Sequence, residues 1–410
     1  MTSISPAPNL NNERHRQQFP ALTNKSYFNY GGQGPMPQAA MEAITRAQEH
    51  IQQLGPFSTE VNAWITQEAK ATREAIATEL GVPAQTITLT EDVTVGCNIA
   101  LWGIDWQPGD HLLLSDCEHP GVVAIAQEIG RRFGVEVSTC PLMATLNDGN
   151  PAAVVVQHLR STTRLVVLSH IFWNTGQVLP LAEIVKKCKQ NEQSSPPVRV
   201  LVDAAQSVGL LDLNLTELGA DFYAFTGHKW WCGPTGVGGL YVRPEARSSL
   251  KPTFIGFRGI VTDGEGTPVG WQPDGRRYEV STSAFGQYAA LRAAIATHQQ
   301  WGTAKERYQQ ICYLGSYLWQ RLTQLPQISC LRTAPPEAGL VCFQVTSSKR
   351  EASTVHRQLM QFLEQKALMT RTLVNPDCVR ACVHYFTLES EIDQLVTGIQ
   401  EFCLLQDKSE

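Results

Sequence analysis

The chain has 410 residues, enough for one large α/β domain with a smaller companion. Apolar residues make up 43% of the chain and charged residues 17%, which is typical of a packed globular protein and not of a disordered or fibrous one. The formal net charge is −5 and the positive residues are scattered, so we expect neither nucleic acid nor an anionic membrane as a partner.

The first two dozen residues lack the apolar core of a secretory signal, and no later stretch reaches the roughly 18 apolar residues that a transmembrane helix needs. The eleven cysteines are dispersed, a pattern typical of reduced thiols in the cytoplasm. Cys378 and Cys382 form a close pair, but their spacing is not that of a CxxC motif and no histidine cluster lies nearby. We therefore expect a cytoplasmic protein without a metal site.

Apolar residues at helical spacing predict two helices near the N-terminus, at residues 35–54 and 59–80. The middle of the chain alternates short apolar runs with further helical patterns at 120–133 and 181–190. The predicted strands lie at residues 86–90, 111–115, 135–139, 165–169, 198–203, 221–225 and 237–242. Continuous apolar strands between helices predict an α/β fold with a mainly parallel sheet covered on both faces.

Residues 251–279 are rich in glycine, proline and aromatic side chains, and we expect a long loop there. Two long helices, 284–301 and 303–325, lead into a small α/β unit. Its predicted strands are 340–345 and 379–385, and its predicted helices are 351–365 and 389–405. The expected organisation is a large domain of residues 22–282 and a small domain of residues 283–410, with residues 1–21 packing near the small domain.

The most informative residues follow two predicted strands of the large domain. Asp203 ends an apolar strand, at the edge where open α/β sheets bind ligands. Taken alone, Asp203 is better explained as a helix N-cap. However, Gln206 follows it, and Lys229 comes shortly after the next apolar strand, between a glycine–histidine pair and two tryptophans. Surface lysines extend their charge into water and need no such neighbours.

Pyridoxal 5′-phosphate (PLP) accounts for this set of residues together. Its protonated ring nitrogen needs an anionic partner, which Asp203 supplies. Its phenolate O3′ needs a donor, which Gln206 offers, and its aldehyde needs the amine of Lys229. Thr226 and His228 provide hydroxyl and imidazole donors for the phosphate. The sequence therefore predicts PLP as the cofactor, bound to Lys229 as a Schiff base.

Two further segments fit this cofactor less specifically. His119 precedes a proline that starts a helix, and taken alone it is a capping or core histidine. Beside the Lys229 set, we expect its ring to stack on the cofactor. Thr94 and the adjacent amide of Val95 lie at a predicted helix N-terminus, which suits a phosphate dianion but also an ordinary helix cap. The GVGG at 236–239 lacks the GxGxxG spacing and precedes a strand, which excludes a nicotinamide-binding motif.

The block VDAAQSVG…DFYAFTGHKWWCGPTGVGGLY resembles the class V, fold-type I pyridoxal-phosphate enzymes, a family that holds cysteine desulfurases, isopenicillin-N-epimerase-like proteins and kynureninase-like lyases. The similarity runs from about residue 19 to the C-terminus. Within the family, the strings FNYGGQGPMP, SHIFWNTGQVLPLAEI and NPDCVRACVHY are most similar to the cyanobacterial L-cysteine/L-cystine C–S lyases. The resemblance implies a PLP-dependent transferase fold with a smaller C-terminal α/β domain.

The resemblance also implies roles for single residues. Lys229 would be the Schiff-base lysine and the base for the α-carbon, with Asp203 and Gln206 as ring partners and His119 stacked on the ring. The phosphate would be held by a set of polar residues: Thr94, Val95, Thr226 and His228.

Four other residues take roles from the resemblance alone. Asn174 would lie near the substrate or O3′. Thr282 would reach the phosphate of the neighbouring subunit in a homodimer with shared active sites. Arg371 and Arg380 match two arginines on the substrate side, and the planar guanidinium suits a carboxylate because it binds both oxygens.

One difference from the desulfurases favours β-elimination over transfer of sulfur to a protein cysteine. Desulfurases carry a mobile loop with a nucleophilic cysteine, whereas only eight residues separate Arg371 from Arg380 here. Cys378 is expected to be structural, with nothing nearby to lower its pKa. We therefore expect β-elimination by a C–S lyase, giving pyruvate, ammonia and persulfide or sulfide from cystine or cysteine. Sulfur metabolism, including iron–sulfur cluster assembly, is the expected setting, with the sulfur acceptor unknown.

Three alternatives stay open. A cysteine desulfurase and an amino-acid epimerase of the isopenicillin-N-epimerase-like type would use the same cofactor and lysine. A silent pyridoxal-binding regulatory protein would show no turnover. Formation of pyruvate distinguishes the lyase from all three.

Overall fold

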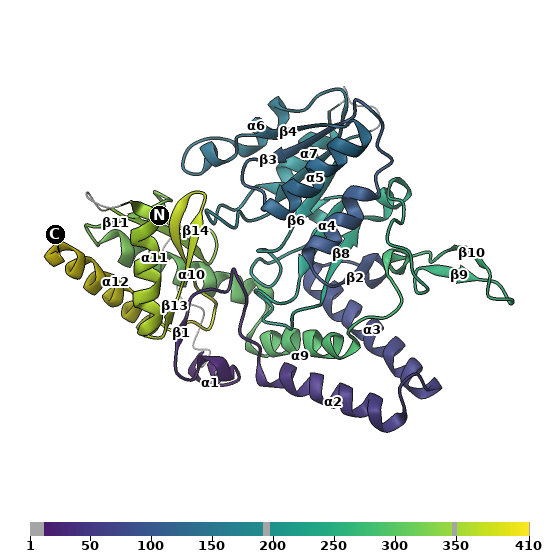
Figure 1. The fold of residues 1–410 in the computed structure, drawn as a ribbon, viewed down its shortest axis with the longest axis horizontal. Helices are drawn as coiled ribbons and strands as arrows, with labels where there is room; N and C mark the ends of the chain where they lie inside the picture. Colours follow the sequence, from purple (N-terminus) through teal and green to yellow (C-terminus); the bar gives the residue numbers. More distant parts are fainter. Residues whose placement is uncertain (1–11, 192–196, 347–350, 410) are drawn as a thin grey trace.

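The computed structural model describes residues 12–191, 197–346 and 351–409. A large sheet wrapped by helices forms one part of the molecule, and a smaller sheet carrying the C-terminal helices forms another (Figure 1). Residues 1–11 of the expected N-terminal segment lie outside the described residues.

The large sheet has seven strands in the order β2-β8-β7-β6-β5-β3-β4. Their bounds are β2 Ile87–Thr90, β3 His111–Ser115, β4 Glu136–Cys140, β5 Thr163–Ser169, β6 Arg199–Asp203, β7 Phe222–Thr226 and β8 Gly238–Val242. The strands β2, β8 and β7 pair antiparallel, and all other neighbours pair parallel. The predicted α/β fold with a mainly parallel sheet is confirmed, and each predicted strand lies within two residues of its observed position.

The sheet is buried on both faces. Leu113 of β3 belongs to one hydrophobic core, whereas its neighbours Leu112 and Leu114 belong to another. Successive side chains of a strand point to opposite faces, so both faces must be apolar where helices cover both. The helices and short turns of this part are α4 Val93–Trp102, α5 Pro120–Phe133, α6 Pro151–Gln157, α7 Leu181–Lys189 and α8 Leu215–Leu218.

Three long helices pack together beside this sheet: α2 Gln38–Leu54, α3 Thr59–Leu80 and α9 Phe285–Trp301 (Figure 1). Alanines allow α2 and α9 to approach closely, with Ala40 and Ala43 against Ala290 and Ala294. We expected the helix at 284–301 to open the small domain, but it packs on helices from the N-terminal part of the chain. The exact division between the domains stays a prediction.

The smaller sheet is antiparallel, in the order β11-β12-β15-β14. Its strands are β11 Ile328–Cys330, β12 Leu340–Val345, β14 Arg371–Val374 and β15 Asp377–Cys382, and its helices are α10 Ala304–Thr323, α11 Ala352–Gln365 and α12 Glu389–Ser409. The predicted strand 379–385 is displaced: β15 begins earlier, and residues 383–385 lie outside it, with His384 and Tyr385 in a buried aromatic cluster. The sequence did not predict β11 or β14.

The N-terminal segment is tied to the C-terminal part. It contains α1 Asn12–Arg16 and β1 Ser26–Tyr27, and β1 pairs in parallel with β13 Leu368–Met369. This pairing brings residues 28–34 between the two sheets, against the loop that carries Lys229: the amide of Gly34 donates to the carbonyl oxygen of His228 at 2.8 Å.

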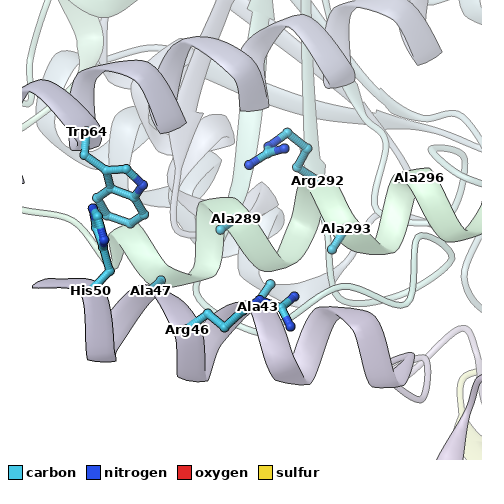
Figure 2. Close-up of a pocket in the computed structure, with 9 residues that line it drawn as sticks. All are labelled: Ala43, Arg46, Ala47, His50, Trp64, Ala289, Arg292, Ala293 and Ala296. Atoms are coloured by element: carbon cyan, nitrogen blue, oxygen red, sulfur yellow. The ribbon is translucent and has the colours of Figure 1, made fainter.

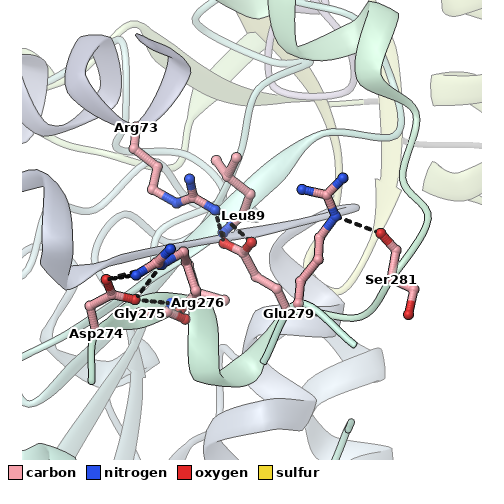
Figure 3. A network of polar contacts seen from close by, with 9 residues as sticks. Arg73, Leu89, Asp274, Gly275, Arg276, Glu279 and Ser281 are labelled. Carbon is pink, nitrogen blue, oxygen red and sulfur yellow. Dashed lines mark hydrogen bonds and ion pairs between the residues drawn. The ribbon is translucent and has the colours of Figure 1, made fainter. Parts of the chain in front are cut away.

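The prediction of a long irregular loop at 251–279 is wrong in part. The segment contains a projecting hairpin, β9 Ile260–Thr262 and β10 Pro268–Trp271 (Figure 1). The segment that follows the hairpin is held by buried Glu279. Its carboxylate accepts a hydrogen bond from the amide of Leu89 at 2.8 Å and forms an ion pair with Arg73 at 2.5 Å (Figure 3). A carboxylate that is both ion-paired and hydrogen-bonded can be buried without a large penalty.

No helix in the described part of the chain is long and apolar enough to cross a membrane. None of the eleven cysteines, all of which the structure describes, forms a disulfide, and ten of them are buried.

Candidate active site

Asp203 is the last residue of β6, at the carboxyl edge of the large sheet. Its Oδ1 accepts a hydrogen bond from the amide of Ala205 at 2.9 Å, and turns follow it. The alternative that Asp203 caps a helix is therefore wrong. Burial raises the pKa of this carboxyl, while the Ala205 amide and the charge of Lys229 act in the opposite direction. Its Oδ2 has no hydrogen-bond partner in the described chain and remains available to a ligand.

Lys229 lies in the short connection between β7 and β8. Because β6 and β7 are parallel neighbours, with Asp203 beside Ala224, this connection emerges at the same edge as Asp203. Burial lowers the pKa of the Lys229 amine to about 8; Asp203 opposes this shift, and Arg380 and Arg371 add to it. Within the described residues its Nζ makes no hydrogen bond. Near neutral pH a minor fraction of this amine is therefore uncharged and nucleophilic, far larger than the fraction for an ordinary lysine.

Thr226 and His228 act as a pair. The hydroxyl of Thr226 lies 2.6 Å from Nδ1 of His228, and Thr226 is fully buried. Burial lowers the pKa of His228, and the charge of Lys229 lowers it further. The hydrogen bond fixes the orientation of the imidazole and leaves Nε2 for a ligand. Direct contact between Thr226 and a phosphate stays a prediction.

His119 is the N-cap of α5, where its Nδ1 accepts from the amide of Gly121 at 3.2 Å. The capping role and the predicted stacking role are compatible, because the ring is exposed and packs edge-on against Trp173, with centroids 5.7 Å apart. Burial lowers the pKa of His119, and Asp203 opposes this shift. These electrostatic couplings place His119 in the same cluster as Asp203 and Lys229.

The side-chain amide of Gln206 makes two hydrogen bonds within the chain that the sequence did not predict. Its Oε1 accepts from the indole nitrogen of Trp230 at 2.9 Å, and its Nε2 donates to the carbonyl of Gly31 at 2.9 Å. One hydrogen of Nε2 is left for the predicted contact with O3′. Gln206 therefore also holds the loop after Lys229 against residues 28–34.

The first turn of α4 agrees with the prediction at Thr94 but not at Val95. Thr94 is exposed in this turn, as expected. The amide of Val95 donates to the carboxylate of Asp92 at 2.9 Å, because Asp92 is the N-cap. The expectation of a free amide at Val95 is therefore wrong, and Thr94 remains the candidate phosphate ligand of this turn.

Arg380 is a buried cation without a carboxylate partner in the described chain. It is 2% exposed; its guanidinium donates to the carbonyl of Trp173 at 2.8 Å and to Oδ1 of Asn29 at 3.3 Å, and its Nε is unpaired. Arg371 lies directly opposite it in the β14–β15 pairing. Like charges across two strands repel each other, so this arrangement calls for an anion.

Two further predicted site residues, Asn174 and Thr282, make other contacts. Asn174 donates to the carbonyl of Asn375, in the turn between β14 and β15, at 2.9 Å, and its buried Oδ1 has no partner. Thr282 is exposed and lines a cavity of about 1450 Å³ beside α3 and the β9–β10 hairpin. Within the described part of one chain, no hydrogen bond joins Thr282 to the other predicted site residues.

Glu118 is a site residue that the sequence reasoning missed. It is buried, and it accepts from the hydroxyl of Ser115 at 2.5 Å and from the hydroxyl of Ser169 at 2.7 Å. Burial raises the pKa of Glu118 to about 7, although these hydrogen bonds act against the shift. It joins the ends of β3 and β5 and directly precedes His119 in the chain. The sequence signal for Glu118 was an acidic residue next to His119, together with serines at the ends of β3 and β5.

The chemistry of this donor set fits PLP. The edge offers a partly neutral amine at Lys229, a carboxylate oxygen at Asp203 without a protein partner, and an oriented imidazole at His228. These are the groups that an aldehyde, a protonated ring nitrogen and a phosphate require. The residues of this chain that would hold the cofactor are Thr94, His119, Asn174, Asp203, Gln206, Thr226, His228 and Lys229. A contribution of Thr282 from a second subunit stays a prediction.

Residues 26–395 match the model of the family Aminotransferase class-V. The chain belongs to this family. Two structures of the cystine C–S lyase C-DES are similar to it, each with a TM-score of 0.91. One, in complex with its reaction product cysteine persulfide, is 51% identical and covers 94% of this chain and 100% of its own. The other is a lysine-to-alanine mutant with glycine covalently linked to the PLP cofactor. It is 50% identical and covers 94% of this chain and 99% of its own.

More distant relatives have other activities. Isopenicillin N epimerase from Streptomyces clavuligerus is 28% identical over 383 residues, covering 91% of this chain and 93% of its own length. Cysteine desulfurase from Klebsiella pneumoniae is 27% identical over 412 residues, covering 95% of this chain and 97% of its own length. The predicted family, fold and PLP cofactor are confirmed by these comparisons. The roles of individual residues stay predictions.

In the cofactor-free protein, the rate of labelling of Lys229 by an amine reagent should rise through a midpoint near pH 8, because burial lowers the pKa of this amine to about 8. In Asp203→Asn the midpoint should move lower still, since the lost negative charge stabilised the ammonium form. Peptide mass spectrometry after timed labelling measures both. The exposed Asp105→Asn serves as the control and should leave the midpoint in place. A midpoint near 10.5, the ordinary value for lysine, would show that the amine is not buried as described.

Proposed function

We propose that this chain is a PLP-dependent C–S lyase that performs β-elimination on L-cystine or L-cysteine. The observation that carries the proposal is the buried Arg380, which has no carboxylate partner in the described chain and lies within electrostatic reach of the partly neutral amine of Lys229. Together they offer a carboxylate site and a base at one edge of the sheet. The likeness to the cystine C–S lyase C-DES, at half of the residues and over nearly the whole chain, supports the choice of reaction.

Each residue of the site has a separate role in the proposed reaction. When bound, PLP supplies an electron-withdrawing ring next to the substrate's α-carbon. Asp203 keeps a negative charge beside the ring nitrogen, which maintains that electron demand. Arg380 binds the substrate carboxylate through its planar guanidinium, and Arg371 adds positive charge at the rim. Lys229, once it no longer holds the cofactor, accepts the α-proton at Nζ, as its lowered pKa allows.

Loss of the β-sulfur follows loss of the α-proton. From cystine, the C–S bond breaks and the electron pair leaves with the sulfur as cysteine persulfide. The remaining aminoacrylate takes up water and gives pyruvate and ammonia. A persulfide is a weaker base than a thiolate and leaves more readily, so cystine should be the better substrate.

The position of Cys378 argues against a desulfurase. Its side chain is fully buried in β15 and packs with Cys342 and Leu373. A sulfur acceptor must reach the substrate as a thiolate, which requires exposure and a lowered pKa. Of the eleven cysteines, the least buried is Cys330 in β11, on the edge strand of the smaller sheet. Elimination needs no protein thiol.

Product analysis tests the reaction class. With cystine, the PLP-loaded protein should release pyruvate and a persulfide, and Cys378→Ala should do so at a rate within about 2-fold of the parent, because a buried cysteine replaced by alanine loses only packing. Alanine as the product, or complete loss of turnover in Cys378→Ala, would restore the desulfurase. A D-amino acid without pyruvate would point to the epimerase.

The two arginines should behave differently on substitution. Arg380→Ala should weaken transition-state binding by about 2–5 kcal/mol for every amino-acid substrate, because it removes a buried charged contact. Arg371→Ala should cost less, since Arg371 is exposed, and its effect should be larger for cystine, which carries a second carboxylate. Steady-state kinetics with cystine and cysteine measure both effects. The control is Arg357→Ala, an exposed arginine on α11. Equal kinetics for Arg380→Ala and this control would exclude Arg380 from the substrate site.

A homodimer with shared active sites is the proposed assembly. Its expected surface is the exposed apolar segment around the β9–β10 hairpin, which includes Phe254, Ile255, Phe257, Val261, Val269 and Trp271. Apolar clusters of this kind on a soluble protein typically mark an interface. A second hollow, of about 370 Å³, lies between α2 and α9 and is lined by alanines, His50 and Trp64 (Figure 2).

Sedimentation and mixing experiments test the dimer. The protein should sediment as a dimer, and mixing inactive Lys229→Ala with impaired Thr282→Ala should raise activity above that of either variant alone, because one mixed site then has both residues. An active monomer at high dilution would contradict the shared site. The cytoplasmic location and the link to iron–sulfur assembly stay predictions.

A further inference from the structure

Two buried imidazoles contact the backbone immediately after Lys229. Nε2 of His384 lies 2.9 Å from the carbonyl oxygen of Trp230, and Nε2 of His298 lies 2.8 Å from the carbonyl oxygen of Trp231. The two rings stack on each other with centroids 5.4 Å apart. They come from different parts of the chain: His298 from α9 and His384 from the segment that follows β15.

The hydrogen-bond partners fix the tautomer of both rings. A carbonyl oxygen only accepts, so each Nε2 must carry the hydrogen. Nδ1 of His384 correspondingly accepts from the amide of Tyr385 at 3.0 Å. Nδ1 of His298 accepts from the hydroxyl of Tyr385 at 2.6 Å. Burial lowers the pKa of His384 to about 3 and that of His298 well below its ordinary value, so both rings are neutral.

The chain of donors extends to the N-terminal helix. Since the hydroxyl of Tyr385 donates to His298, it must accept from Nε2 of His15 in α1, which lies 2.8 Å away. His15 is in turn contacted through Nδ1 by Gln18 at 3.2 Å. The donors therefore run in one direction, from the N-terminal helix through Tyr385 and His298 to the carbonyl of Trp231.

The backbone held in this way is tightly enclosed and strained. A Cβ atom on Gly34 would lie 2.2 Å from the carbonyl oxygen of Lys229, and one on Gly209 would lie 2.7 Å from the backbone of Trp230. Cys232 has φ of 49°, a left-handed conformation that is unfavourable for a residue with a side chain. Such a conformation persists only where surrounding contacts enforce it.

The same cluster has the composition of a metal site, since Sγ of Cys232 and ring nitrogens of His298 and His384 lie within 4.8 Å of one another. However, all four ring nitrogens already make the hydrogen bonds described above. Burial also raises the pKa of the Cys232 thiol, which opposes formation of the thiolate that a metal would bind. The arrangement therefore favours a hydrogen-bonded cluster over a metal centre.

We propose that His298 and His384 are positioning residues, which clamp the carbonyls of Trp231 and Trp230 and thereby fix Lys229 relative to Asp203 and Arg380. The importance of Lys229 rests on the proposed function, but the clamp itself is a property of the folded chain. The clamp links α9, the Lys229 loop and the segment that follows β15, the strand that carries Arg380.

The test compares side chains that place their N–H donor at different distances from the backbone. Glutamine places an N–H donor near the position of the imidazole Nε2, whereas asparagine places one near Nδ1. In cofactor-free His384→Asn and His298→Asn, amide hydrogen exchange should speed up by at least about 10-fold at Gly34, Cys232 and Gly233, whose amides hydrogen-bond within or onto the loop, and not in β5 or β6. The glutamine variants should stay near the parent rate.

Turnover gives a second readout. In the PLP-loaded asparagine variants, kcat should fall roughly 10- to 100-fold while KM changes little, because a misplaced lysine impairs the chemistry and Arg380 still binds substrate. Tyr385→Phe is a milder variant that should speed up exchange at Cys232 and Gly233. His356→Ala is the control: it removes a buried imidazole bonded to Val345 and Asp377, and it should leave the exchange of the Lys229 loop unchanged.

Three results would overturn the clamp. These are equal exchange in the glutamine and asparagine variants, faster exchange spread evenly over β5 and β6, or a stoichiometric metal in the purified parent that is lost in both His→Asn variants. The exchange pattern is measured without cofactor or substrate. A protein that shows the pattern but makes no pyruvate would therefore retain the clamp and refute only the proposed reaction.

Discussion

Uncompensated charge at the carboxyl edge of the large sheet is the constraint on which the rest of the structure depends. Asp203 is a buried carboxylate with one free oxygen, Arg380 is a buried guanidinium without a carboxylate partner in the described chain, and Lys229 lies within electrostatic reach of both. Buried charges are costly unless they are paired, and leaving them unpaired is typical of a site that a charged ligand completes. A zwitterionic amino acid and an anionic cofactor supply the complementary charges.

The fold serves to hold these charges at fixed positions. Parallel pairing of β6 with β7 brings the ends of both strands to one edge, which places Asp203 near the Lys229 loop. The smaller sheet contributes Arg380 through β15, and the same segment continues into His384 and Tyr385. Residues 28–34 fill the space between, with Gly34 against the loop and Gly31 against the Arg380 guanidinium. A side chain at Gly34 would collide with the backbone of Lys229, and one at Gly31 would displace the Arg380 guanidinium.

The sequence allowed the large sheet to be predicted well, because strands buried on both faces are continuous apolar runs that end in polar residues. It also located Asp203, Gln206, Thr226, His228 and Lys229, since each follows such a run. Elements with weak patterns were missed: β14 has only four residues, of which Leu373 alone is buried, and β9 and β10 lie in a segment rich in glycine and proline. The cap at Asp92 was missed because its bond to Val95 depends on where α4 begins.

Contacts between distant residues lay beyond local patterns. The pairing of β1 with β13, the packing of α9 on α2, and the two histidines on the Trp230 and Trp231 carbonyls all join segments that are far apart in the sequence. Glu118 had a local signal, an acid between a strand end and His119, but only the meeting of β3 with β5 shows that two serines bind it.

The most direct measurement for the central claim is to locate the cofactor's covalent attachment. Borohydride reduction of the PLP-loaded protein, followed by digestion and peptide mass spectrometry, should find the cofactor on Lys229 alone, and Lys229→Ala should lose the absorption band of the linked cofactor. Attachment to any other lysine, or an unchanged spectrum in Lys229→Ala, would contradict the account.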